Sequence, residues 1–213
     1  MSDPREGTVT KDLAESALKG AEAELAKAES AARVVADEIA KSRLAIQALL
    51  GRLYRISKEF PTWKTIKLGT RPNVAALKRA IIAQKNRISP WGNDILDRIS
   101  VSPKETEIDL VRLTVAELGL PKGGIREQIY EKAKELGLYP CPAEVGPQIR
   151  LQYQDQPSGE WLLIGMEPIT DSNGDPHVFY VGHVSVVRWL SARNGDAGHF
   201  WSPESRWVFV RRK

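Results

Sequence analysis

The amino-acid sequence predicts an α+β protein in which a long N-terminal coiled-coil helix precedes a mostly antiparallel β-sheet domain with one main helix. Two observations predict this fold class. Apolar residues recur in alternating steps of four and three between Ala14 and Phe60, and short β-type runs separated by Gly, Asn, Asp and Pro follow in the second half. We therefore expect a helical region at residues 1–102 and an α+β domain at residues 103–213.

The long helix is predicted from about residue 11 to residue 59. Thr10 can cap its N-terminus, and Pro61 ends it. A period of 3.5 residues sustained over this length is typical of a coiled coil, whose apolar seam needs a partner helix. The larger seam residues are Leu18, Leu25, Val35, Ile39, Ile46, Leu49, Leu53 and Ile56.

The charges beside this seam favour antiparallel pairing. Acidic residues flank the first half of the seam, whereas Arg43 and Arg52 flank the second half. A parallel dimer in register would place Glu24 against Glu29 of its partner, which is a like-charge contact. The seam can close in a homodimer, or in a hairpin with the next predicted helix of the same chain, Val74–Ile88.

The second half of the chain predicts one main helix among strands. Residues 107–115 can form a helix or a strand, and we favour the strand because β-branched and leucine residues dominate them. A helix is expected at residues 125–136, with Gly137 as its C-terminal glycine. The remaining strands are expected at residues 148–153, 161–166, 178–181, 186–190 and 207–211.

Two phrases of this second half, Leu138–Gly146 and Trp161–Ile169, resemble a set of uncharacterised bacterial proteins with no assigned function. The resemblance extends over about residues 108–213 and supports a domain boundary near residue 102. It implies nothing about activity, and the N-terminal helices show no such resemblance.

Composition narrows the class of protein. Because Cys141 is the single cysteine of the 213 residues, an internal disulfide framework and a cysteine zinc site are excluded. The sequence has no long apolar run or signal-peptide pattern, so we expect a cytoplasmic protein with no membrane partner. No motif identifies a cofactor, and none is expected.

Basic residues concentrate in the middle of the chain, where residues 61–100 hold eight basic and two acidic side chains. Such a segment can bind nucleic acid through phosphate contacts, or it can face the acidic half of the long helix. The residues of this nucleic-acid alternative are Lys64, Lys67, Arg71, Lys78, Arg79, Lys85 and Arg87.

Asp171, Asn173 and Asp175 place oxygen-bearing side chains at alternate positions, as a calcium loop requires. However, Pro176 replaces the glycine that such a loop needs, and Asn173-Gly174 is a strong hairpin signal. The turn is therefore the preferred interpretation, and a calcium site the weaker one.

Three histidines, His177, His183 and His199, also lie in this half. Together with nearby carboxylates they leave open a small metal-dependent hydrolase, although their spacing matches no known metal motif.

Aromatic residues provide the remaining candidate site. Trp161, Trp189 and Trp207 lie within predicted strands and are expected in the core. A loop rich in Gly, Ser and Asn carries the predicted partner-binding residues, which are His199, Phe200, Trp201 and Arg206. The sequence thus favours a non-enzymatic cytosolic interaction protein over the nucleic-acid-binding and hydrolase alternatives.

Overall fold

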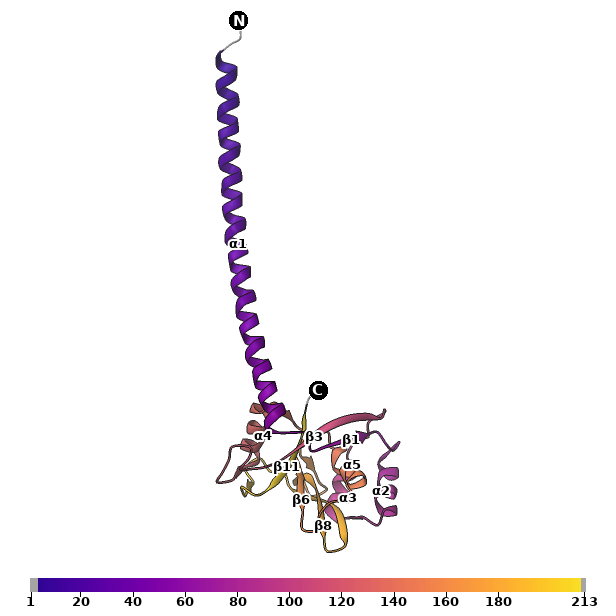
Figure 1. Ribbon diagram of the computed structural model, residues 1–213. Helices are drawn as coiled ribbons and strands as arrows, with labels where there is room; N and C mark the ends of the chain where they lie inside the picture. The colour runs from indigo at the N-terminus through magenta and orange to yellow at the C-terminus, as the bar shows by residue number, and fades with distance from the viewer. Residues whose placement is uncertain (1–3, 212–213) are drawn as a thin grey trace. The chain divides into compact units, whose positions relative to one another are not determined.

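The computed structural model describes residues 4–211, with side chains at residues 15–50 and 60–211. The chain divides into two compact units, Met1–Arg52 and Leu53–Lys213. Figure 1 shows the long helix α1 and, separately, the strands and shorter helices of the second unit. The predicted α+β class with a mostly antiparallel sheet is confirmed.

Helix α1, Pro4–Glu59, contains 56 residues and is therefore about 84 Å long. It begins before the predicted residue 11, because Pro4 suits the first turn of a helix, where its missing N–H costs no hydrogen bond. The large apolar side chains along its seam at residues 15–50 are 56–61% exposed. Leu53 and Ile56 lie outside the described side chains, so the seam is described over its first six large residues.

The sheet of the second unit contains nine strands, most of them antiparallel to their neighbours. Its main path runs β1 (Lys64–Leu68), β3 (Thr106–Thr114), β11 (Arg206–Arg211), β6 (Trp161–Ile164), β8 (Pro176–Val184), β9 (Val187–Asn194) and β2 (Arg87–Ile88). Off this path, β5 (Leu138–Tyr139) pairs with β11, and β7 (Ile169–Thr170) pairs with β8. A separate two-stranded ladder joins β10 (Phe200–Trp201) to β4 (Gly124–Ile125).

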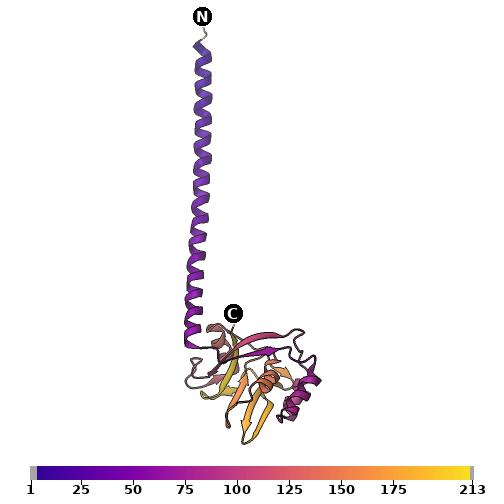
Figure 2. The same ribbon diagram turned by 45° about the vertical axis from the view of Figure 1, so that its right-hand side comes forward.

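Helices cover both faces of this sheet (Figure 2). Helix α5 (Val145–Gln152) packs on the face that carries Phe179, and a Cβ at Gly146 would lie 2.7 Å from the Cβ of Phe179. Helix α4 (Arg126–Glu135) packs on the opposite face through Tyr130, whose ring meets Trp207 and Phe209 edge-on. The close approach at Gly146 explains why this position of α5 holds a glycine.

The domain boundary lies at residues 52–53 rather than near the predicted residue 102. Strand β1 pairs with β3, and helix α2 (Val74–Ala83) buries Leu77 and Ile81 in the core of the second unit. The Glu144 carboxylate also accepts hydrogen bonds from the backbone N–H groups of Gly69 and Ser102, each 2.8 Å long. Residues 60–102 therefore complete the sheet domain instead of buttressing the long helix.

Local predictions are confirmed where one residue determines the geometry. Strand β3 (Thr106–Thr114) covers all but the last residue of the favoured strand at residues 107–115, and Gly137 ends the α4 segment at φ 74°. Asn73 caps α2 by accepting a hydrogen bond from the Ala76 N–H at 2.9 Å, although α2 ends at Ala83, five residues early. Helix α3 (Pro90–Leu96) follows with Ser89 as its cap.

The strand predicted at residues 148–153 is instead helix α5. Seven of its eight residues are buried, including Gln148 and Arg150. A helix that is buried on all sides has no polar face, so its sequence lacks the 3.6-residue period that identifies a surface helix. None of the described helices has the length and apolar character needed to cross a membrane.

Candidate partner-binding site

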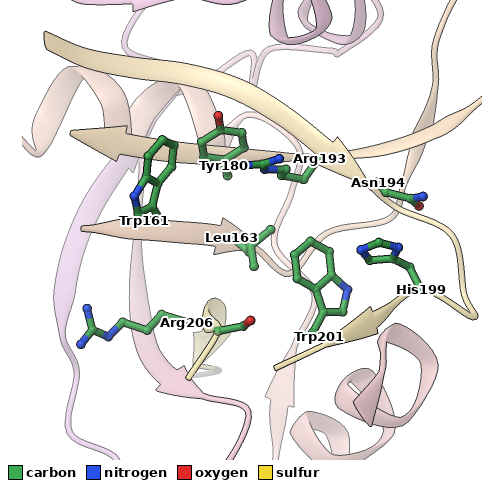
Figure 3. A pocket seen from close by; sticks show the side chains of 9 residues that line it. Trp161, Leu163, Tyr180, Arg193, Asn194, His199, Trp201 and Arg206 are labelled. Atoms are coloured by element: carbon green, nitrogen blue, oxygen red, sulfur yellow. The ribbon is translucent and has the colours of Figure 1, made fainter. Parts of the chain in front are cut away.

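A pocket of about 330 Å³ opens on the face of the sheet that α4 leaves partly uncovered (Figure 3). Its walls combine aromatic and basic side chains from five strands and the loops beside them. The lining residues are Trp161, Leu163, Tyr180, Arg193, Asn194, His199, Trp201, Ser205 and Arg206. Three of the four predicted partner-binding residues thus line one pocket.

Phe200 is the exception among the four. It precedes Trp201 in β10, so its side chain points to the other side of that strand. The ring is 59% exposed and lies over Gly123, where a Cβ would come within 2.6 Å of the Phe200 Cζ. Phe200 therefore lies beside the pocket without lining it.

Strand register brings the pocket floor together. Leu163 pairs with Tyr180 of β8 and with Trp207 of β11, and Trp161 lies two residues before Leu163 on the same face. Trp161 pairs with Gly182, over which its indole lies. The predicted core position is wrong for Trp161, which is 41% exposed, and confirmed for fully buried Trp207. Trp189 is half-buried.

The second wall is anchored to the core through Trp201. Its ring meets Trp207 edge-on at 5.2 Å between ring centroids, and His199 packs against it at 4.8 Å. The Trp201 Nε1 is buried and has no hydrogen-bond partner among the described residues. The ladder with β4 holds this wall, since Trp201 pairs with Gly124.

The pocket is positively charged. Arg193 and Arg206 are its two charged lining residues, and no carboxylate lines it. The guanidinium carbon of Arg193 lies 5.1 Å from the centroid of the Tyr180 ring. Within residues 15–50 and 60–211, neither arginine forms an ion pair with Asp or Glu, so both charges are available to an anionic ligand.

A larger pocket, of about 490 Å³, lies beside α4. Its lining carries both signs of charge, because Arg126 and Lys134 share it with the carboxylates of Glu127, Glu131 and Glu167. The Arg126 guanidinium is already engaged with the Tyr130 ring at 4.9 Å. This pocket therefore offers less selectivity for a charged ligand than the smaller one.

A buried polar network, which the sequence analysis missed, stabilises the opposite side of the sheet. Arg150 donates to the Gln156 Oε1 at 2.7 Å and to the backbone oxygen of Tyr153 at 2.6 Å. The Tyr153 hydroxyl donates to Glu160, which also pairs with Arg112. Burial lowers the pKa of Arg150 to about 10, which leaves it charged at neutral pH. These contacts hold the α5–β6 connection, and of the residues named Arg112 lines a pocket, a small one beside Trp63.

The Asp171 carboxylate stabilises a hairpin turn. Its Oδ1 accepts from the backbone N–H groups of Asn173 and Asp175, while its Oδ2 lies 3.0 Å from the His177 Nε2. Burial raises the pKa of Asp171, but these hydrogen bonds outweigh it and hold the pKa below its ordinary value. Gly174 adopts φ 94° in this turn, so the predicted hairpin is confirmed.

The three histidines do not form a cluster. His177 stacks on Trp91, the Nδ1 of His183 lies 2.6 Å from the backbone oxygen of Gln156, and His199 lines the pocket. Across the part of the chain that the structure describes, no group of three His, Cys, Asp or Glu side chains could hold a metal ion.

The basic residues of the middle segment lie on several elements and are largely paired. Lys64, Lys67 and Lys78 form ion pairs with Asp155, Glu105 and Asp97. Arg71 donates to the backbone oxygen of Thr70, and Arg87 lies over the Trp189 ring. Arg79 and Lys85 are exposed. Among these seven described residues, three therefore have an acidic partner and four do not.

Comparison of this chain with protein families, with curated proteins and with solved structures finds no match.

Proposed function

We propose that this protein is a non-enzymatic interaction protein that pairs with a second copy of itself through α1. In this proposal it presents the 330 Å³ pocket that contains Trp161, Tyr180 and Trp201, called the aromatic pocket below, to a partner. The exposed seam of α1 carries this proposal. Burying one Leu, Ile or Val side chain contributes about 1.5–3 kcal/mol, and six such seam side chains are more than half exposed. In helix α2, Leu77 and Ile81 are already buried in the sheet domain, so these two side chains are not available to cover the seam.

An antiparallel pair has one register that suits both size and charge. If facing seam residues have numbers that add to 74, Ile39 packs against Val35 of the second copy at the centre. Ile46 then faces Ala28, so that a small side chain meets a large one, and Leu25 faces Leu49 as a contact between two large side chains. A shift of one heptad in one direction leaves one kind of opposite-charge pair, Glu22 with Arg43, and a shift in the other direction leaves none.

The same register sets Glu29 opposite Arg43 and, by sequence position, Glu24 opposite Arg52. Two-fold symmetry repeats each pair, and the like-charge contact is between the two copies of Glu38 at the centre. A parallel dimer in register instead repeats the Glu24–Glu29 contact on both sides. Opposite charges beside the seam set helix orientation, so these contacts support the antiparallel pair.

Light scattering of the full-length protein during size-exclusion chromatography tests this assembly. We expect twice the chain mass of 23.7 kDa. The double variant Ile39→Asp/Ile46→Asp should be monomeric, because it places charges in the apolar seam. The matched control Ala40→Asp/Gln47→Asp moves the same charges one residue along, outside the seam, and should stay dimeric. A monomeric wild-type protein, or a dimeric seam variant, would contradict the proposal.

A further inference from the structure

We propose that the aromatic pocket binds a nucleoside phosphate, with the planar base against the Trp161 indole and the phosphate at Arg193. The inference rests on the recognition role proposed above and specifies the chemistry of its ligand. A free nucleotide and one nucleotide of a single strand share this chemistry.

The stacking surface comes from Trp161. This indole is 41% exposed, although the next three residues of its strand, residues 162–164, are buried. It packs against the Tyr180 ring at 5.2 Å and lies on Gly182, which leaves its outer face open. Figure 3 shows Trp161 and Trp201 on opposite sides of Leu163. Bases stack on such aromatic faces, because every base has a π-face.

The charge of the pocket selects an anion. Arg193 supplies a guanidinium group beside the stacking surface, and no lining carboxylate repels a phosphate. Arg206 lines the pocket as well, but its side chain extends away from Arg193 (Figure 3). Guanidinium groups donate paired N–H groups in the planar geometry that phosphate oxygens accept. Arg193 lies over the Tyr180 ring, which positions its charge beside the stacking surface. The pocket thus combines the two features of single-strand binding sites, namely aromatic faces and cationic side chains.

Strand pairing favours a nucleotide over an extended peptide. Strands β6, β8 and β11, which form the pocket floor, are each paired on both sides, so they have no free backbone edge for an added strand. At the pocket floor, recognition therefore uses side chains. Asn194 and His199 can donate and accept hydrogen bonds at the edge of a base. The volume of about 330 Å³ lies within the usual range for small-ligand sites.

Titration of the full-length protein with 5′-nucleoside monophosphates and with a short oligothymidylate, followed by tryptophan fluorescence, tests the inference. We expect quenching by at least one of these probes. Trp161→Ala and Arg193→Ala should each weaken that binding at least tenfold. Trp91→Ala and Arg33→Ala remove an exposed indole and an exposed guanidinium outside the pocket, and should leave affinity unchanged. Circular dichroism confirms that each variant is folded.

The two kinds of probe distinguish a free nucleotide from a nucleotide of a single strand as the ligand. Binding of a monophosphate supports a free nucleotide, whereas binding of the oligothymidylate alone supports a single strand. No binding of either at millimolar concentration overturns the inference, as does full affinity in both pocket variants. Capture of an acidic aromatic peptide in place of both probes would also overturn it. Light scattering reports assembly independently, so failure here leaves the proposed pairing of α1 intact.

Discussion

Gly182 lies opposite Trp161 in the ladder between β6 and β8, and a Cβ at Gly182 would come within 2.6 Å of the Trp161 Cε3. Real Cβ contacts are essentially never this short, so the indole lies flat on the sheet only because the facing residue has no side chain. The wall of the pocket therefore depends on two residues from neighbouring strands. Trp161 supplies the ring, and Gly182 leaves the space that the ring occupies because it has no side chain.

The substitution Gly182→Ala should displace the Trp161 ring and cost about 1–3 kcal/mol of folding free energy through overpacking. In a Trp161→Ala background the same substitution should cost much less, because the clash is gone. Urea unfolding of the four proteins in this cycle measures the coupling. Additive effects of the two substitutions would show that Gly182 does not position the indole.

Disulfide cross-linking tests the antiparallel register. The double variant Leu25→Cys/Leu49→Cys should form covalent dimers on mild oxidation, because the proposed register sets these positions opposite each other. Within one helix they lie about 36 Å apart, which excludes an intrachain bond. The single variant Leu25→Cys serves as the control and would cross-link in a parallel dimer in register.

The single native cysteine does not disturb this readout. Cys141 is buried, its Sγ donates to the backbone oxygen of Val208, and burial raises the pKa of its thiol. Because the thiolate is the reactive form, we expect Cys141 to stay reduced under the same mild oxidation. Cross-linking of the wild-type protein would contradict this.

Asp94 should make the stability of the sheet domain depend on acid pH. Hydrogen bonds from the Ser172 hydroxyl and backbone, together with Arg98, lower the pKa of Asp94 to about 2. A lowered pKa contributes stability that is complete above the unfolded value of 3.8 and is lost as pH falls towards 2. Asp94→Asn should therefore lower the melting temperature at pH 7, and the difference from wild type should shrink between pH 4 and pH 2. Parallel melting curves across this range would contradict the assignment.

Arg150 should be important for stability but not for binding. Arg150→Leu leaves the Gln156 and Tyr153 oxygens buried without their donor, and we expect a loss of about 3 kcal/mol. Arg79→Leu, at an exposed position, should change the unfolding free energy by less than about 0.5 kcal/mol. Urea denaturation measures both. A loss at Arg150 no larger than at Arg79 would show that the network contributes nothing.

The sequence allowed correct prediction wherever a local pattern determines the structure. The exposed strand–turn signal at Asn173-Gly174, the glycine at residue 137 and the cap at Asn73 each act within a few residues. Strand β1 escaped prediction because its lysines suggested a basic segment. Lys67 points outward, as lysines of an edge strand typically do, and β1 ends the sheet.

The site was predicted in part for the same reason. His199, Trp201 and Arg206 lie within eight residues of one another, so a single loop suggested them. Trp161, Tyr180 and Arg193 come from three strands and meet only through the ladders between β6, β8 and β9. A local sequence pattern does not determine which residues of distant strands pair. The pairing of Trp161 with Gly182 could therefore not be predicted from the sequence around either residue.

The length of α1 gives the proposed dimer the properties of a bivalent ligand-binding protein with a stiff spacer. In an antiparallel pair centred near residue 37, the two helix ends at residue 59 would lie about 65 Å apart along the common axis. A ligand with one binding group could occupy only one pocket at a time. A polymer long enough to reach both pockets would bind more tightly without any new contact, because the second binding event becomes intramolecular.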